Sequence, residues 1–287
     1  MKKLIALAVA AAAMPAMAAI SISCGAEVSY NDATNSSNVT TKTMGTEQVD
    51  ITFSAASELD NGMTISSGIT LRSSGDALNN DGGEGSITIS GSFGTLAVGD
   101  VAGALDALDG ATAAVPDNDM SNGTGEDAAL SYTLPEMVSG LTVMASFAPK
   151  DGGDTGVAAD TTSVAAKYSA AGFSVFVGQD SEPTSYESGY GFAYTMNGLS
   201  VGYTASEDDN NTGSDTERSG FQAGYTTGNL TLAVNTSEVE TGGVVTNDLT
   251  SYGLSYSLGG GASVYASTKD DDKTTEENTT VGLKFSF

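Results

Sequence analysis

The last eight residues of the chain read TVGLKFSF (residues 280–287), and their pattern decides the fold class. Apolar and polar side chains alternate through this stretch, which is typical of a β-strand with one apolar face and one polar face. The apolar positions are Val281, Leu283, Phe285 and Phe287, and the polar positions are Thr280, Gly282, Lys284 and Ser286. The chain therefore ends in a half-apolar strand.

The same alternation extends back through the chain as far as Ile20, without a helical period of comparable strength. Short connections rich in Gly or Asn, such as Asn197-Gly198, can supply the positive φ angles of tight hairpins. Longer connections rich in Asp, Asn, Gly and Thr lie between them, at about residues 31–46, 75–84, 100–125, 150–160, 181–186, 207–217, 237–247 and 269–278. Eight long and seven short connections join sixteen predicted strands.

Two architectures fit many half-apolar strands, a soluble β-sandwich and a membrane β-barrel. A sandwich gives no reason for connections that alternate between long and short. In an outer-membrane barrel, short turns lie on one side and long loops on the other, and an even number of strands brings both termini to the same side. The apolar face then contacts lipid, and the Ser, Thr and Gly face lines a wet interior. The sequence therefore predicts an all-β fold, a transmembrane antiparallel β-barrel of sixteen strands.

The composition excludes most other classes of protein. The chain has 36 acidic residues against 10 basic ones, so a nucleic-acid partner is excluded by charge. It has no His and one Cys, so Ser-His-Asp or Cys-His catalysis and typical zinc sites lack their residues. We therefore expect no enzyme activity and no tightly bound cofactor, and we interpret Cys24 as a small apolar strand residue.

The first 18 residues are predicted to be a cleaved signal peptide. Lys2 and Lys3 precede an apolar stretch that ends in Ala16-Met17-Ala18, a small-residue cleavage pattern. Residues 19–287 would then form the barrel. The chain is expected to be exported through the periplasm to the cell outer membrane.

Three segments resemble a known family. GSFGTLAVGD (residues 91–100), followed by Gly103-Ala104 and Ala107-Leu108, resembles the hairpin that leads into the third loop of the Gram-negative general porins, especially the alphaproteobacterial kind. Residues 251–267 are similar to the penultimate hairpin of those porins. Gly282, Phe285 and Phe287 resemble the C-terminal signal read by the outer-membrane assembly machinery.

The resemblance implies a homotrimer of barrels in contact with outer-membrane lipid and lipopolysaccharide. Each barrel would be narrowed by its third loop, at about residues 100–125, and would pass small hydrophilic solutes by diffusion. The predicted constriction acids are Asp100, Asp106, Asp109, Asp117 and Asp119. The alternative is that these acids are merely solvated loop charges. For Asp117 and Asp119 we favour the alternative.

Strand parity assigns charged side chains to the lumen face. They are Glu27, Asp50, Glu58, Arg72, Lys167, Arg218 and Lys284. The family sets a cluster of arginines on the wall opposite the acidic loop, but here the early strands offer Arg72 alone, with Lys42 as a candidate from the first loop. The net field should therefore be negative and favour cations.

The alternatives to a general diffusion channel are a substrate-selective channel, a surface adhesion barrel and an outer-membrane hydrolase. A substrate-selective channel would need a ladder of arginines or aromatic residues along the lumen, an adhesion barrel would be narrower and plugged, and an outer-membrane hydrolase would need a His base. The acid clusters at residues 207–209, 270–272 and 276–277 could hold exchangeable divalent cations near lipopolysaccharide or be simply solvated.

Overall fold

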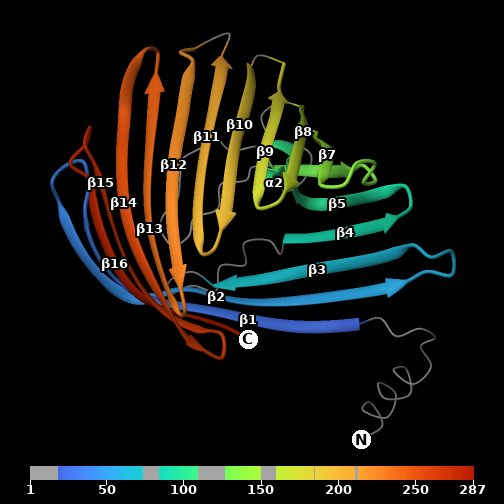
Figure 1. Cartoon of the computed structure of the whole chain (residues 1–287), viewed down its shortest axis with the longest axis horizontal. Coiled ribbons are helices and arrows are strands. Elements are labelled where there is room, and N and C mark those ends of the chain that lie inside the picture. Colours follow the sequence, from blue (N-terminus) through green and yellow to red (C-terminus); the bar gives the residue numbers. More distant parts are fainter. Residues whose placement is uncertain (1–18, 74–83, 109–126, 150–159, 184, 211–212) are drawn as a thin grey trace, which may run out of the picture.

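The computed structural model describes residues 19–73, 84–108, 127–149, 160–183, 185–210 and 213–287, which form a closed β-barrel (Figure 1). The strands are β1 (Ala19–Thr34), β2 (Thr40–Glu58), β3 (Thr64–Ser73), β4 (Glu84–Gly91), β5 (Gly94–Ala102), β6 (Asp127–Thr133), β7 (Leu141–Ala148), β8 (Thr161–Ala170), β9 (Phe173–Ser181), β10 (Ser185–Met196), β11 (Leu199–Asn210), β12 (Thr216–Thr227), β13 (Leu230–Thr241), β14 (Val244–Gly259), β15 (Ala262–Asp271) and β16 (Glu277–Ser286). A short helix, α2 (Ala104–Leu108), follows β5. No helix in these described ranges is long and apolar enough to cross a membrane.

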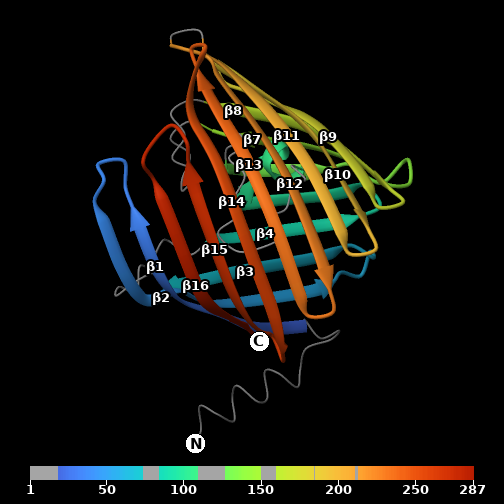
Figure 2. The ribbon, with the colours of Figure 1, turned by 60° about the vertical axis from the view of Figure 1, so that its left-hand side comes forward.

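Every strand pairs antiparallel with its neighbours in the chain, and β16 pairs with β1 to close the ring. Figure 2 shows these two strands side by side at the seam. The backbone N–H of Phe287 donates to the carbonyl of Cys24 at 2.8 Å, and the N–H of Cys24 donates to the carbonyl of Phe287 at 3.1 Å. Closure leaves no edge strand unpaired. The predicted fold class and the sixteen strands are confirmed.

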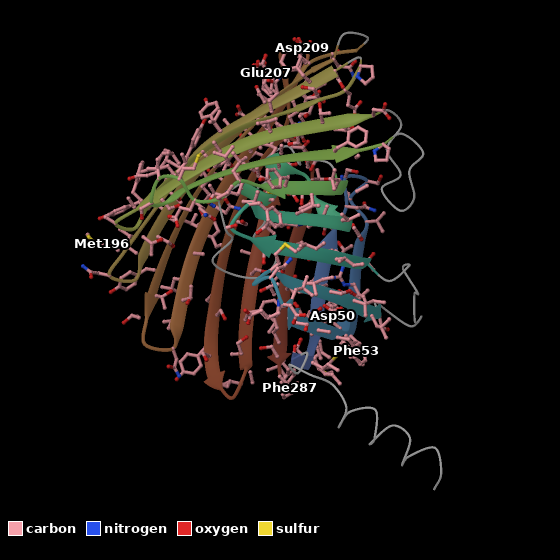
Figure 3. All side chains as sticks on the ribbon, turned by 90° about the vertical axis from the view of Figure 1, so that its right-hand side faces the viewer. Asp50, Phe53, Met196, Glu207, Asp209 and Phe287 are labelled. Carbon is pink, nitrogen blue, oxygen red and sulfur yellow. The ribbon has the colours of Figure 1, made fainter. Side chains whose placement is uncertain are left out.

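The two faces of the wall differ in chemistry. On the outer face Ile22 is 62% exposed and Val281 is 53% exposed, while on the inner face Asn235 and Ser251, which lie directly opposite each other, are 1% exposed. On β2, Phe53 lies on the outer face and Asp50 on the inner face (Figure 3). An outer face of bare apolar side chains is stable only in an apolar surrounding, which is the arrangement of membrane barrels.

Short turns lie at one end of the barrel, where the sequence pattern puts them. Between β10 and β11, Asn197 has a φ of 51° and Gly198 a φ of 84°, the left-handed pair that a two-residue hairpin requires. A Cβ at Gly198 would lie 2.3 Å from the carbonyl oxygen of Thr226, so no larger residue fits there.

Several connections at the other end are shorter than predicted. β1 runs to Thr34 and β2 starts at Thr40, and β13 and β14 are separated by Gly242 and Gly243 alone. The long connections predicted at 31–46 and 237–247 are therefore wrong in extent. Strands can continue beyond the membrane as polar hairpins, because their backbone groups pair with each other and no apolar face is needed there.

Candidate functional site

The interior of the barrel is the candidate site, and helix α2 lies inside the ring of strands (Figure 1). Ala104, Leu105 and Leu108 are at most 8% exposed. Ala104 and Leu108 form an apolar cluster with Met144 of β7 and Ala165 of β8. The start of the predicted third loop is thus packed on the inner wall.

The predicted constriction acids are only partly described. Asp106 lies on the exposed side of α2, away from the packed wall. Asp100 lies in a β-bulge of β5, where two residues oppose one residue of β6. Asp109, Asp117 and Asp119 lie outside the described residues.

Two of the lumen-face basic residues lie beside carboxylates on the wall. Arg72 of β3 is directly opposite Asp50 of β2, with Nε 3.2 Å from Oδ1. Lys284 of β16 is directly opposite Glu27 of β1, with Nζ 3.6 Å from Oε2. The hydroxyl of Tyr265 on β15 also donates to Glu27. The positive charges of Arg72 and Lys284 are therefore largely offset by the neighbouring carboxylates of Asp50 and Glu27.

The other parity-assigned charges are dispersed around the ring. Glu58 is exposed at the end of β2, opposite Thr64. Lys167 stands on β8 between Thr142 and Phe176, and Arg218 stands on β12 between Ser206 and Val239. These residues are not gathered with Arg72 into a basic cluster.

Glu47 is a lumen-face acid that strand parity missed. Glu27 pairs with Gln48 whereas Val28 pairs with Thr46, so Glu47 is the extra residue of a β-bulge. Its Oε1 accepts a hydrogen bond from Nδ2 of Asn31 at 2.6 Å and another from the hydroxyl of the buried Ser29. Glu47 falls at a position where the alternation with Val49 and Ile51 calls for an apolar side chain. This misplaced carboxylate is the sign in the sequence that the alternation breaks there.

The same bulge shifts the parity of the residues before it. Lys42 lies opposite Asp32 in the same register as the outward Tyr30 and Met44, and its Nζ is 2.8 Å from Oδ2 of Asp32. The suggestion that Lys42 lines the lumen wall is therefore wrong. Lys269 is a missed basic residue, because it lies opposite the buried inward Ser251 on β14.

Three carboxylates form a row across neighbouring strands of the inner wall. Glu187 of β10 is directly opposite Asp180 of β9 on one side and Asp208 of β11 on the other. Like charges in directly opposed positions repel, which is a cost to the fold. Arg218 is near enough to attract Glu187 electrostatically. This part of the lumen wall therefore carries three acidic groups beside one basic side chain, Arg218.

The middle of the wall formed by β2 to β4 is rich in hydroxyl groups. The hydroxyls of Thr52 and Thr70 are 3.0 Å apart, and Ser54, Ser66 and Ser86 line the same region. The charged side chains at the described inner positions of β2 and β3 are the paired Asp50 and Arg72, with Glu47 and Glu58 nearer the two ends of β2; the positions between them include small hydroxylated side chains. This wall provides water-like hydrogen-bonding groups for a passing solute.

The C-terminal residues compared above with an assembly signal have distinct positions. A Cβ at Gly282 would lie 2.5 Å from the ring of Tyr265, so the glycine leaves the space that this ring fills. Phe285 and Phe287 stack with ring centroids 6.4 Å apart on the other face of the last strand.

Asp271 organises the loop between β15 and β16. Its Oδ1 accepts hydrogen bonds from the backbone N–H groups of Asp248 at 3.1 Å and Lys273 at 2.9 Å, and its Oδ2 accepts one from Asn247 at 2.8 Å. Burial alone would raise the pKa of Asp271, but these hydrogen bonds favour the ionised form and lower the pKa below its ordinary value of 3.8. This acid is structural, in contrast to a freely solvated loop charge.

Comparison with known proteins agrees with this architecture. The model of a family described as Gram-negative porin matches residues 5–276. A porin structure refined at 1.8 Å resolution superposes with a TM-score of 0.74 at 18% identity, covering 94% of this chain and 100% of that chain. A variant of the porin of Rh. blastica superposes with a TM-score of 0.75 at 18% identity, with the same coverage.

A third similar structure bears the description "Asymmetric conductivity of engineered proteins", with a TM-score of 0.73 at 17% identity over 94% of this chain and 100% of that chain. No curated protein sequence gives a significant match. The structural likenesses show the fold, and the family model covers most of the sequence. This protein therefore belongs to the Gram-negative porin family.

Proposed function

We propose that this protein is a general diffusion channel that passes small hydrophilic solutes and ions across the outer membrane. The observation that carries the proposal is a closed barrel of sixteen strands with an apolar outer face and a polar inner face. A barrel of this size encloses more volume than its own side chains fill, so water occupies the lumen. Steady single-channel conductance of the purified protein in planar bilayers tests the proposal, and absence of any conductance would refute it.

The channel is expected to prefer cations. The positive charge of Arg72 is offset by Asp50, and that of Lys284 is offset by Glu27. The row of carboxylates around Glu187 contributes additional acidic groups. Asp106 lies on the exposed side of α2 and Asp100 is near it in the chain, so both add further negative charge. Negative charge along a narrow path raises the local concentration of cations. A salt-gradient reversal potential with the sign of anion preference would contradict this.

A substrate-selective channel is the nearer alternative, and a surface adhesion barrel is a more distant one. Within the described strands, the large aromatic residues of the inner face include Phe176 and Tyr265, which pack over Gly191 and Gly282. These two rings pack against glycines of the wall, which gives no support for a continuous aromatic ladder along the path. Saturation of the current by one class of solute would favour the selective alternative.

We also propose export, assembly and trimer formation as in the family. Residues 1–18 would direct export through the periplasm, and the strand that ends in Phe285 and Phe287 would be read by the outer-membrane assembly machinery. Three copies would then associate through their apolar outer faces. Native electrophoresis of the folded protein against its heat-dissociated form tests the homotrimer.

The acids near the long-connection end are proposed to hold exchangeable divalent cations close to lipopolysaccharide. Glu217 lies directly opposite Glu207 on one side and Glu240 on the other, and Figure 3 shows Glu207 and Asp209 together at the end of β11 opposite to the Met196 turn. No metal-binding group of three or more acidic or Cys side chains occurs in the described part of the chain. Any ions would therefore be loosely held. Unchanged thermal stability after chelation would favour simple solvation.

A further inference from the structure

Helix α2 begins without a side-chain cap of its own. The residue before it is Gly103, whose carbonyl accepts the helical hydrogen bond from the N–H of Ala107 at 2.9 Å. The first N–H groups of a helix have no partner within the helix, and a preceding Ser, Thr, Asp or Asn usually satisfies one of them. Glycine cannot do this.

The barrel wall supplies the missing acceptors. The N–H of Ala104 donates to Oγ of Ser146 on β7 at 2.9 Å, and the N–H of Leu105 donates to Oγ of Ser163 on β8, also at 2.9 Å. These bonds join residues 42 and 58 positions apart in the sequence. The start of the helix is therefore fixed to two adjacent strands rather than to its own loop.

The side chain of Leu105 is held by a recess in the next two strands. A Cβ at Gly189 of β10 would lie 3.1 Å from Cδ1 and 3.6 Å from Cδ2 of Leu105. A Cβ at Gly178 of β9 would lie 2.8 Å from Cδ1 of Leu105 and 2.7 Å from Cβ of Ala165. Because Leu105 is 2% exposed, the recess encloses it almost completely.

We propose that Leu105, with its glycine recess and the two serine hydroxyls, is a clamp that positions residues 103–108 in the lumen and sets the open level of the channel. These are positioning residues, since none of them needs to touch a passing solute. The inference rests on the proposed channel function. Gly189 is then required by Leu105 across the strands, whereas Gly178 is required both by Leu105 and by Ala165 of the adjacent strand β8.

Gly189 offers the most selective perturbation. Its added side chain would meet Leu105 first, and the next atom, the carbonyl oxygen of Ala205, is at an ordinary distance of 3.8 Å. Gly189→Leu should therefore displace α2 and change both the unit conductance and the current noise. Adding Leu105→Ala to Gly189→Leu should restore a single steady level, because the new side chain then occupies the vacated space. Gly68→Leu is the matched control, since a Cβ there lies 3.7 Å from its nearest neighbour and far from α2 in the wall order.

A second measurement, thiol labelling, tests the clamp independently of channel conductance. Ala104→Cys, made in a Cys24→Ala background, places a thiol of similar size at a position that is 0% exposed. Its reaction with a water-soluble maleimide should be slow in the folded protein. Adding Leu105→Ala should speed the reaction about 30-fold, which corresponds to about 2 kcal/mol of lost apolar burial. Ser146→Ala with Ser163→Ala should speed it as well.

The outcomes separate the clamp from the channel. Faster labelling in the Leu105→Ala and serine variants, with rescue of Gly189→Leu by Leu105→Ala, supports the clamp. Labelling at the parent rate in all of these variants would overturn it, even if the protein conducts normally. Absence of conductance in the parent protein would refute the channel function, while the labelling result would still decide about the clamp. If Gly189→Leu does not fold, Leu105→Ala and the serine pair provide the decision.

Discussion

Replacing Glu27 by Ala is expected to destabilise the barrel by about 1.5–4 kcal/mol. Glu27 lies on β1, and it joins Tyr265 of β15 and Lys284 of β16 across the closing seam. Loss of a hydrogen bond to a charged acceptor costs about 1.5–3 kcal/mol. The Lys284 side chain is 53% exposed, so the ion pair adds only about 0–1 kcal/mol.

The urea midpoint of unfolding in detergent micelles measures this change, since the midpoint falls in proportion to the lost free energy when the slope is unchanged. Glu58→Ala is the matched control, because Glu58 is exposed at the end of β2. Tyr265→Phe should reproduce the hydrogen-bond part of the loss while keeping the ring over Gly282. If Glu27→Ala unfolds at the same urea concentration as Glu58→Ala, the seam contacts do not stabilise the barrel and the reasoning fails.

Three further expectations follow from the contacts described above. Arg72→Ala should increase cation preference in salt-gradient reversal potentials because it removes the positive charge beside the carboxylate of Asp50. An unchanged or anion-shifted potential would count against a charged wall. Asp271→Asn should lower the thermal midpoint of unfolding at neutral pH. Because the pKa of Asp271 in the folded protein lies below 3.8, the difference in midpoint between the parent and this variant should shrink as the pH falls through that folded pKa. A difference in midpoint that does not depend on pH would contradict the role of the Asp271 charge. Deleting Phe287 removes two backbone hydrogen bonds to Cys24 and should reduce the amount of folded protein in outer membranes, whereas a normal yield would show that the last residue is dispensable.

The alternation of apolar and polar side chains was sufficient to predict where the strands lie, but not where each strand ends. Apolar side chains mark the part of each strand that faces lipid, so residues 281–287 could be assigned from the sequence. The polar ends of β1, β2, β13 and β14 have the same composition as loops, and the sequence interpretation placed connections there. Backbone pairing between neighbouring strands, which composition does not report, decides where each of these strands ends.

Bulges limited the assignment of side chains to the lumen. A bulge inserts one residue and reverses the parity of everything on one side of it. Because of the bulge at Glu47, the side chain of this acid lies on the lumen face and accepts a hydrogen bond from Asn31. Lys42, on the other side of the bulge, lies on the outer face beside Asp32. Alternation counted from Val49 backward could not place either residue correctly.

By itself the sequence determined that this protein is a sixteen-stranded barrel with an apolar exterior, because the alternation of side chains and the order of turns are local properties of the chain. The resemblance of its short motifs pointed to the porin family. Only the tertiary structure decided that Glu27 meets Tyr265, that Leu105 enters the recess at Gly178 and Gly189, and that Asp180, Glu187 and Asp208 form one row. These contacts join residues on different strands, and they exist only after strand register and ring closure bring those strands together.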